Sequence, residues 1–383
     1  MEPARKIIQT TWDIFGDRLG DVEHMVRQDR LDLYGWEEPA HLRAVVRRVI
    51  CEGMPSEFNP AELVLPDNEF ARAAGEPRRG DQREAVGDLL EAGAAAMAKL
   101  ARYVAPDLTL DECLGLCCVL LLYGRPAILI ENGKLARVPA FWNVLEDQRD
   151  NIETVQRGVG RIGLVGHPEF DWAGTGFLVK DDCVLTTSTV ARVFAEAHRK
   201  GKWAFREGVS AWMDFATGVA CPASGACRII AIAGVDERHD LAVLEVEPQA
   251  ETGGGPLPLS VSTTASFEPA GRLVYTVGIP ARDARRGESE RIARIFREVY
   301  NVKRVQPGIL YDWHESEGER WLEHDCGMLG HSGGSCLVDL ETHEVVGLHL
   351  HGRYLGRGIA APMALLSETP LLRHRLKYRP ANR

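Results

Sequence analysis

The first part of the chain carries apolar side chains at helical spacing. From His41 to Cys51 aliphatic residues recur on one side and arginines on the other, which predicts an amphipathic helix. Ala85 to Tyr103 is rich in alanine and leucine and is also expected to be helical. Thr109, followed three residues later by Glu112, has the sequence of a capping box that begins another helix. Phe141 to Gln156 has the pattern of one more helix.

The pattern changes at Val159, where short β-rich runs begin to alternate with turns of Gly, Pro and Asp. Many short strands at such spacing are typical of an all-β sandwich or barrel. A Gly/Pro-rich stretch at residues 253–258 lies midway and is expected to connect two half-barrels. The predicted strands are Arg161–Val165, Gly176–Val179, Val184–Thr187, Val209–Phe215, Arg228–Ala233, Leu241–Val246, Leu273–Val277 and a hairpin of Cys336–Val338 with Val345–Leu348.

These patterns predict a multi-domain α + β protein in which a mainly helical region precedes a β domain. We expect an N-terminal helical domain over residues 1–75, followed by a polar Gly/Pro/Arg linker at residues 74–82. A second helical segment or linker domain should cover residues 83–157, and the β domain residues 158–375. A chain of 383 residues is long enough for this number of domains.

Composition narrows the class of protein. With 45% apolar and 26% charged residues, the chain has the make-up of a soluble globular protein. The longest apolar run, Leu114 to Tyr123, is too short to span a membrane, and no apolar signal core opens the sequence. We therefore expect no membrane association and a cytoplasmic location. A net charge of −10 argues against nucleic acid as a general partner.

The cysteines favour neither disulfides nor a metal site. There are nine, an odd number spread widely along the chain, which fits reduced thiols in a cytosolic protein. Cys221 and Cys227 flank a loop, but no second pair exists that would complete a zinc site. We expect no metal and no cofactor.

The stretch with the clearest chemical character is the sequence Gly-His-Ser-Gly-Gly at residues 330–334. Glycines allow the backbone to turn tightly, so that a hydroxyl is exposed beside amides that can hold an oxyanion. Gly330, His331, Ser332 and Gly333 are therefore the candidate oxyanion turn. A Gly-Gly pair between strands is also common in an ordinary hairpin, so this turn needs support from the rest of the chain.

That support comes from a set of landmarks in a fixed order. Together they resemble trypsin-like serine peptidases, and most closely cytoplasmic bacterial members related to glutamyl endopeptidases. The resemblance covers residues 159–372 and implies two six-stranded antiparallel barrels with an active cleft between them. The landmarks are Gly174–Val179, Val184–Val190, His239–Leu244, Val277–Pro280, Val302–Gly308, the Gly330–Gly334 turn and Val346–His349.

The resemblance places Asp240 and Thr189 at two of the three positions of the catalytic triad. Such peptidases use a histidine base, an aspartate that orients it and a serine nucleophile, in that chain order. Asp240 matches the aspartate, although a strand-capping aspartate is the alternative reading. Thr189 stands at the histidine position, and a threonine hydroxyl cannot serve as a general base.

The nucleophile, the third member of the triad, can be aligned in two registers. Read as Gly-x-Ser-Gly-Gly, the turn has Ser332 as its nucleophile. Counted back from Asp339 against the glutamyl endopeptidase pattern, Gly333 falls on the nucleophile and Ser332 on the residue before it. In the second register two of the three triad members are absent.

His349 is the candidate substrate-binding residue. By resemblance it lies on the strand that lines the primary specificity pocket, where glutamyl endopeptidases place a histidine against an acidic side chain. The alternative is a hydrogen-bonded structural histidine.

The main functional hypothesis is therefore a pseudopeptidase: a trypsin-like domain that recognises a protein or peptide by strand addition in its inter-barrel cleft. The resemblance places such modules in bacterial antiviral defence or signalling systems. One alternative is an active serine endopeptidase that uses Ser332 and Asp240 with a non-standard or partner-supplied base. A further alternative is a structural subunit of an assembly. The helical region is a candidate surface for a protein partner, with Trp12, Tyr34 and Trp36 as contact residues, although packing in a core is the commoner role of such side chains.

Overall fold

The computed structural model describes most of the chain and all of the predicted site residues. Tyr34, Trp36, the predicted helix at residues 41–51 and Cys221 lie outside the described residues. The described residues are 2–16, 19–33, 79–103, 106–139, 142, 144–198, 202–216, 226–247, 255–264, 267–282, 292, 295–316, 318–352, 357–373 and 375.

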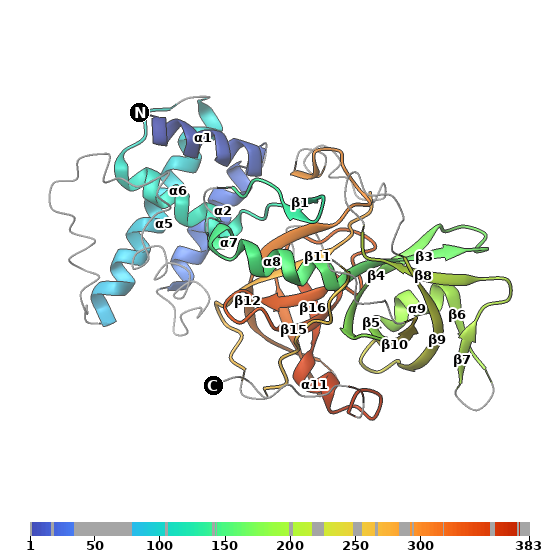
Figure 1. Ribbon diagram of the computed structural model, residues 1–383. Helices are drawn as coiled ribbons and strands as arrows, with labels where there is room; N and C mark the ends of the chain where they lie inside the picture. Colours follow the sequence, from blue (N-terminus) through green and yellow to red (C-terminus); the bar gives the residue numbers. More distant parts are fainter. Residues whose placement is uncertain are drawn as a thin grey trace.

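The N-terminal region is helical, and its helices pack through one apolar core (Figure 1). The predicted capping box at Thr109 is confirmed, because Thr109 Oγ1 accepts from Glu112 N and the Glu112 carboxylate accepts from Thr109 N. Gly124 ends the same helix, where its N–H donates to the Leu120 carbonyl. Within the described residues every helix is too short or too polar to cross a lipid bilayer. The helices of this region are α1 (Glu2–Phe15), α2 (Leu19–Leu33), α5 (Arg79–Arg102) and α6 (Leu110–Tyr123).

Residues 124–139, called the arm below, lead from α6 to the β domain. Strand β1 of the arm (Ile128–Glu131) pairs with the first residues of β12 (Arg304–Ser316), and β2 (Lys134–Leu135) folds back on β1. The predicted helix at Phe141–Gln156 is instead broken into shorter pieces, because residue 148 leaves helical geometry at the start of α8. Those pieces are α7 (Val144–Asp147), α8 (Arg149–Val155) and the 3₁₀ turn η5 (Gln156–Gly158).

The β domain consists of two closed antiparallel six-stranded barrels, which confirms the predicted fold class. The first barrel has the strand order β10-β5-β4-β3-β8-β9, and a small hairpin of β6 and β7 extends from it. Its elements are β3 (Val159–Val165), β4 (Trp172–Lys180), β5 (Cys183–Thr186), α9 (Ser188–Phe194), β6 (Ala195–Ala197), β7 (Trp203–Phe205), β8 (Ser210–Asp214), β9 (Cys227–Asp236) and β10 (Leu241–Val246).

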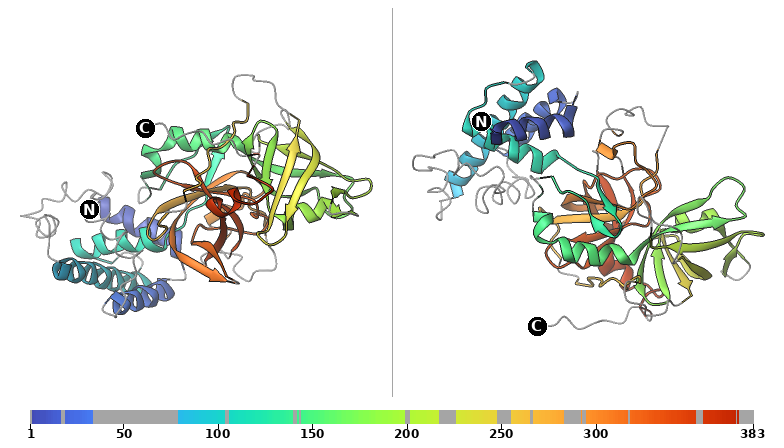
Figure 2. Two further views of the ribbon diagram at one scale, coloured as in Figure 1. Left: turned by 90° about the horizontal axis from the view of Figure 1, so that it is seen from below. Right: turned by 45° about the horizontal axis from the view of Figure 1, so that its top comes forward.

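The second barrel has the strand order β11-β14-β15-β16-β13-β12, closed by pairing of β11 with β12, and the β1–β2 arm extends the same sheet. Figure 2 shows the helical region, the second barrel and the first barrel following one another in a row. The remaining elements are β11 (Leu273–Gly278), β13 (Glu319–His324), β14 (Cys336–Asp339), β15 (Val345–Gly352), β16 (Gly358–Pro362) and α11 (Met363–Ser367).

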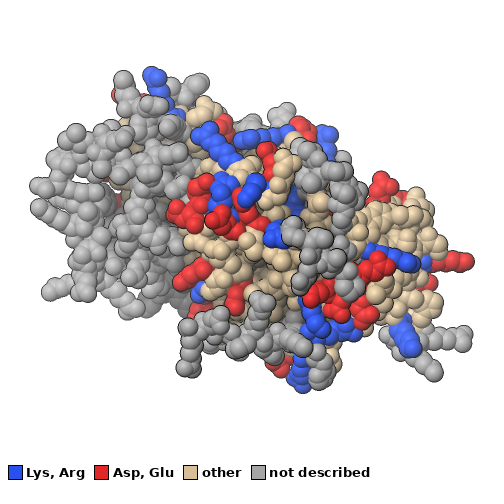
Figure 3. All heavy atoms as spheres, viewed as in Figure 1, with Lys and Arg blue, Asp and Glu red and all other residues tan. Residues whose placement is uncertain are grey.

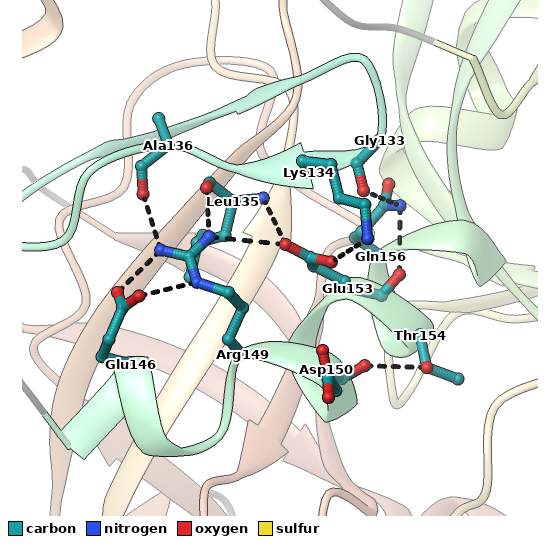
Figure 4. A network of polar contacts seen from close by, with 10 residues as sticks. All are labelled: Gly133, Lys134, Leu135, Ala136, Glu146, Arg149, Asp150, Glu153, Thr154 and Gln156. Atoms are coloured by element: carbon teal, nitrogen blue, oxygen red, sulfur yellow. Dashed lines mark hydrogen bonds and ion pairs between the residues drawn. The ribbon is translucent and has the colours of Figure 1, made fainter.

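A polar network fastens the arm to the helix that enters the first barrel (Figure 4). Glu153 accepts from Leu135 N at 3.0 Å and from Lys134 Nζ at 2.7 Å, while Arg149 donates to the Leu135 carbonyl. Gln156 donates to the Gly133 carbonyl at 3.1 Å. The arm is therefore held along the whole length of α8.

A buried lysine continues this junction into both barrels. Lys303 is 1% exposed, and its Nζ donates to the Gln156 carbonyl at 2.8 Å and to the Phe215 carbonyl at 2.7 Å. These bonds join β12 of the second barrel to the end of β8 in the first. On the surface above, basic and acidic side chains are interleaved where α7, α8 and the arm lie (Figure 3).

Candidate functional site

Asp240 and Thr189 meet at the end of the first barrel that faces the second. Strands β5 and β10 are paired with Thr186 opposite Ala242, so the residues after β5 lie beside the residue before β10. Asp240 Oδ1 accepts three hydrogen bonds from the first turn of α9: from Ser188 Oγ at 2.5 Å, from Thr189 N at 2.8 Å and from Thr189 Oγ1 at 3.0 Å. The carboxylate thus binds the start of this helix.

This arrangement gives Asp240 a structural task at the start of α9. Thr187 caps α9 by accepting from Val190 N, and Asp240 satisfies the next orphan donors of the same turn. Asp240 itself has a positive φ of 48°, a conformation that aspartate tolerates better than most residues. Thr189 is exposed, and its hydroxyl is already a donor to Asp240.

Asp240→Ala should lower the free energy of unfolding by about 1–2 kcal/mol, because the first turn of α9 loses a charged acceptor. Asp240→Asn should have a smaller effect, since asparagine keeps one acceptor and tolerates positive φ. Urea unfolding of both variants at neutral pH measures the difference. Equal stability of Asp240→Ala and the unaltered protein would contradict this role.

The glycine-rich turn at residues 330–334 is held by backbone contacts on both sides. Thr175 N donates to the Gly333 carbonyl at 3.2 Å, and Gly334 N donates to the His349 carbonyl at 2.9 Å. Ser335 Oγ donates to the Ser332 carbonyl at 2.7 Å. The turn is therefore anchored to both barrels and has one defined geometry.

Within this turn the Ser332 side chain points into the protein. The residue is 1% exposed, and its Oγ has no hydrogen-bond partner among the described residues. No described imidazole lies within hydrogen-bond reach of that hydroxyl. The geometry brings Thr189 and Asp240 together but does not join Ser332 to them.

Gly333 is the residue of the turn that faces α9. A Cβ placed on Gly333 would lie 3.3 Å from the Leu350 carbonyl oxygen, 3.7 Å from Thr187 Oγ1 and 3.7 Å from Val190 Cγ2. A side chain at 333 would accordingly extend toward the helix turn that carries Thr189. The Gly333 amide donates no hydrogen bond to any described residue, so it can serve a ligand carbonyl.

His331 and Trp172 form an aromatic contact beside the turn. His331 has a positive φ of 63°, and its ring centroid lies 5.0 Å from that of Trp172 on β4. The imidazole is exposed, and its position across β4 keeps it from acting on the buried Ser332.

His239, which precedes Asp240, turns toward a different part of the cleft. Its Nδ1 lies 2.8 Å from Asp236 Oδ2 and its Nε2 lies 3.8 Å from Glu319 Oε1. Glu319 also pairs with Arg238, so the β9–β10 turn of the first barrel contacts the β12–β13 hairpin of the second. His239 therefore bridges the barrels and is occupied away from Ser332.

His349 is buried on β15 and forms a pair with His324 on β13. His324 Nε2 and His349 Nδ1 are 3.0 Å apart, and the two residues are 0% and 1% exposed. Gly358 makes room for the pair, because a Cβ there would lie 2.7 Å from His324 Cε1. His324 is a functional candidate that the sequence analysis missed, since the contact spans two strands and no local pattern indicates it.

The hydrogen-bond pattern assigns the tautomers of this pair. Cys326 N donates to His324 Nδ1 at 3.2 Å, so the proton of a neutral His324 is on Nε2 and is donated to His349 Nδ1. His349 then carries its own proton on Nε2, for which no described residue is an acceptor. Burial lowers the pKa of His324 to about 4 and that of His349 well below its usual value, so both rings are neutral.

Strand β15 extends past its partner β14 and has an edge on the side of the turn. Its pairing with β14 ends at Leu348, opposite Cys336, whereas its pairing with β16 continues to Gly352. The Leu350 carbonyl lies beside Gly333, as described above. The pairing of β15 with β16 therefore continues beyond the end of β14, beside the turn.

The other groups around the turn supply no further chemistry. Cys326 and Cys336 are fully buried thiols; burial raises the pKa of Cys336 to about 12 and that of Cys326 well above its usual value. In the described part of the chain, no three acidic, histidine or cysteine side chains are grouped so that they could hold a metal ion.

Comparison with known proteins agrees with this architecture. Residues 174–348 match the family of the trypsin-like peptidase domain. The matched residues lie in the β region, whose two barrels have the trypsin-like fold. A search of curated proteins gave no significant match.

Several solved structures are similar to the chain. The HtrA-type protease AlgW with decapeptide has a TM-score of 0.40 at 14% identity, over 58% of this chain and 67% of that one. A serine endoprotease from Yersinia pestis has a TM-score of 0.40 at 18% identity, over 62% and 68% of the two chains. An inactive form of Rv3671c from M. tuberculosis has a TM-score of 0.37 at 14% identity, over 60% and 93%.

Proposed function

We propose that this protein is a pseudopeptidase, a trypsin-like domain that binds an extended peptide and does not cleave it. The observation that carries the proposal is the orientation of the turn: Gly333 faces the helix turn of Thr189, while the hydroxyl of Ser332 is buried and unpaired. This favours the register in which glycine stands at the nucleophile position and threonine at the base. A serine that lacks its base loses roughly a millionfold in turnover, and here the hydroxyl is also inaccessible.

The same geometry supports peptide binding. Leu350 and His351 lie on β15 beyond the end of β14, where an extended peptide could add, and the amide of Gly333, which donates to no described residue, can donate to a peptide carbonyl beside them. His349 is 1% exposed, so a ligand reaches it only if the residues around it move; its neutral Nε2–H, held in that tautomer by His324, then suits a carboxylate or carbonyl acceptor. We infer that the ligand is a peptide with an acidic side chain opposite His349.

A fluorophosphonate probe tests the loss of catalysis. The unaltered full chain should not be labelled, while an active trypsin-like peptidase treated in parallel should be. Labelling of this protein that disappears in Ser332→Ala would overturn the proposal and support the alternative of an active endopeptidase with a partner-supplied or non-standard base.

Peptide binding is tested with a library of extended peptides that differ by Glu against Gln at one position. Fluorescence anisotropy should detect binding of Glu peptides, weakened about tenfold in His349→Gln, an effect near 1.4 kcal/mol. His343→Gln, in the β14–β15 turn and bonded to Gln148, is the matched control and should bind normally. Binding that is lost equally in both variants, or absent for every peptide, would favour a structural subunit instead.

The biological setting of the proposal rests on the resemblance to bacterial cytoplasmic peptidases. We place the protein in the cytoplasm, in a defence or signalling system, with the helical region as the surface for a protein partner. Co-purification of a partner with the full chain, but not with a variant altered only in the cleft, would separate the role of the helical region from that of the peptidase domain.

A further inference from the structure

Arg125 is a buried cation at the point where the helical region meets the second barrel. It follows α6 directly, is 1% exposed, and donates to the Leu122 carbonyl at 2.6 Å and the Gly124 carbonyl at 2.7 Å. Its guanidinium therefore binds the carbonyl end of α6, where a cation is favoured. Trp142 Nε1 donates to the same Gly124 carbonyl at 3.1 Å, and its ring lies 5.7 Å from the guanidinium.

The partner of Arg125 is Asp325, two hundred residues further along the chain. The two form an ion pair with side chains 2% and 12% exposed. Asp325 is fixed from the barrel side as well, since it accepts from Ile309 N and from Tyr311 Oη, each at 2.8 Å. One carboxylate thus connects the end of α6 to strand β12.

Asp325 also immediately precedes the segment that leads into the Gly330–Gly334 turn. Residues 326–329 lead directly from it into Gly330–Gly334, and they make no strand of their own. Gln306 donates to the Gly327 carbonyl, and Ala281 N donates to the Gly330 carbonyl at 3.0 Å. The course of the turn therefore depends on where Asp325 is held.

A second contact between arm and turn is apolar and independent of the ion pair. Ala127 of the arm packs with Leu329, Phe296 and Ile292 in a separate small core. Arg304 holds this core together by donating to the Ala127 carbonyl and, at 2.6 Å, to the Phe296 carbonyl. The arm accordingly touches the 325–331 segment at both its beginning and its middle.

The chemistry of the ion pair favours a positioning role. A buried pair contributes little net stability compared with apolar side chains of the same volume, because both charges lose their hydration. A planar guanidinium, in contrast, fixes direction, because its donors are arranged in a rigid fork. Here the guanidinium donates to the carbonyls of Leu122 and Gly124 and to the Asp325 carboxylate at the same time.

We propose that Arg125 is a positioning residue that couples the helical region to the cleft, with the arm holding the 325–331 segment and hence the Gly330–Gly334 turn in its binding conformation. A partner or a movement that displaces α6 from the barrel then loosens this turn. The inference deepens the proposed function by naming how the same site is regulated, but the coupling itself requires no ligand.

Hydrogen exchange of the full-length protein tests the coupling. In Arg125→Met, amides of residues 326–334 should exchange at least about tenfold faster, while β3–β5 of the first barrel keep their protection. Lys134→Met is the matched control: Lys134 lies on the same arm, is exposed and pairs with the buried Glu153, which keeps its contacts with Arg149 and Leu135 N, so residues 326–334 should be unchanged.

Two further variants keep the test decisive. Arg125→Met/Asp325→Asn removes the buried charge left by the single change, so it should regain thermal stability while residues 326–334 still exchange fast. Restored protection in this double variant would mean that the pair only balances charge, and would overturn the inference. Arg125→Lys keeps the charge without the fork and should also exchange faster at 326–334, which provides the measurement if Arg125→Met does not fold.

The remaining outcomes are equally distinct. Unchanged exchange at 326–334 in Arg125→Lys, or an increase spread evenly over both barrels, would contradict the coupling. Faster exchange confined to 326–334 in a protein that binds none of the peptides would support the coupling while the proposed peptide-binding function fails.

Discussion

Gly334→Ala should destabilise the protein by at least about 3 kcal/mol, because the turn has no room for a side chain at this residue. Gly334 has a φ of +89°, which is strained for any residue with a Cβ. A Cβ there would lie 2.0 Å from the Thr175 carbonyl oxygen and 2.4 Å from Thr186 Oγ1. The first of these contacts is with backbone, so a change of rotamer cannot relieve it.

The neighbouring glycine provides the matched control. At Gly333 a Cβ would have ordinary or slightly close contacts of 3.3–3.7 Å, and the residue has no positive φ. Gly333→Ala and Gly333→Ser should therefore change the free energy of unfolding by less than about 1 kcal/mol. Urea unfolding of the three variants gives the comparison, and equal destabilisation at 333 and 334 would contradict this description of the turn.

The two glycines of the turn differ in the space around them. Of the two glycines 333 and 334, only Gly333 has room for a side chain, and it is the one that faces the Thr189 helix turn. The shape of the turn does not depend on a side chain at 333, because Thr175 N and the His349 carbonyl bind its backbone. The backbone geometry of the turn therefore requires no side chain at residue 333.

The architecture was predictable because its signals are local. Strand Leu241–Val246 begins and ends as expected, since an apolar run follows Asp240 and residues of turn character bound it. The capping box of Thr109 and Glu112 likewise acts within one helical turn. The order of such landmarks was enough to identify two barrels of the trypsin-like class.

The parts that were not predictable depend on contacts between distant residues. Whether Ser332 or Gly333 faces α9 is decided by Thr175 and His349, which hold the turn from different barrels. The break at residue 148 arises where Arg149 turns to bind carbonyls of the arm, a contact that helical periodicity does not encode. Asp240 was expected as a triad or capping residue, and its three bonds to α9 needed the fold to appear.

The free energy of unfolding should fall steeply between about pH 6.5 and pH 4, by about 3 kcal/mol from His324 alone. Burial lowers the pKa of His324 to about 4 in the folded protein, whereas an unfolded histidine has an ordinary value near 6.5. In this window the unfolded chain binds more protons than the folded one, so stability is present at neutral pH and is lost as pH falls. His349, whose pKa is also lowered, contributes in the same direction.

Urea unfolding at pH 7.5, 6.5, 5.5 and 5.0 measures this slope above the range of the carboxylates. Burial opposes ionisation of Asp339, but the hydrogen bond from Arg272 lowers its pKa, so its contribution is lost only at more acidic pH. His324→Gln/His349→Gln should show a much flatter profile, and His198→Gln, which alters a half-exposed histidine, should keep the full slope. A double variant as pH-dependent as the unaltered protein would place the effect elsewhere.

The same titration connects stability to the proposed ligand. A carboxylate bound at His349 Nε2 would favour the protonated imidazole and raise the pKa of His349 in the complex. Binding of a Glu peptide would then take up a proton, so its affinity should increase from pH 7.5 to pH 5.5, while a Gln peptide should show no such increase. The increase should disappear in His349→Gln, which has no imidazole to protonate.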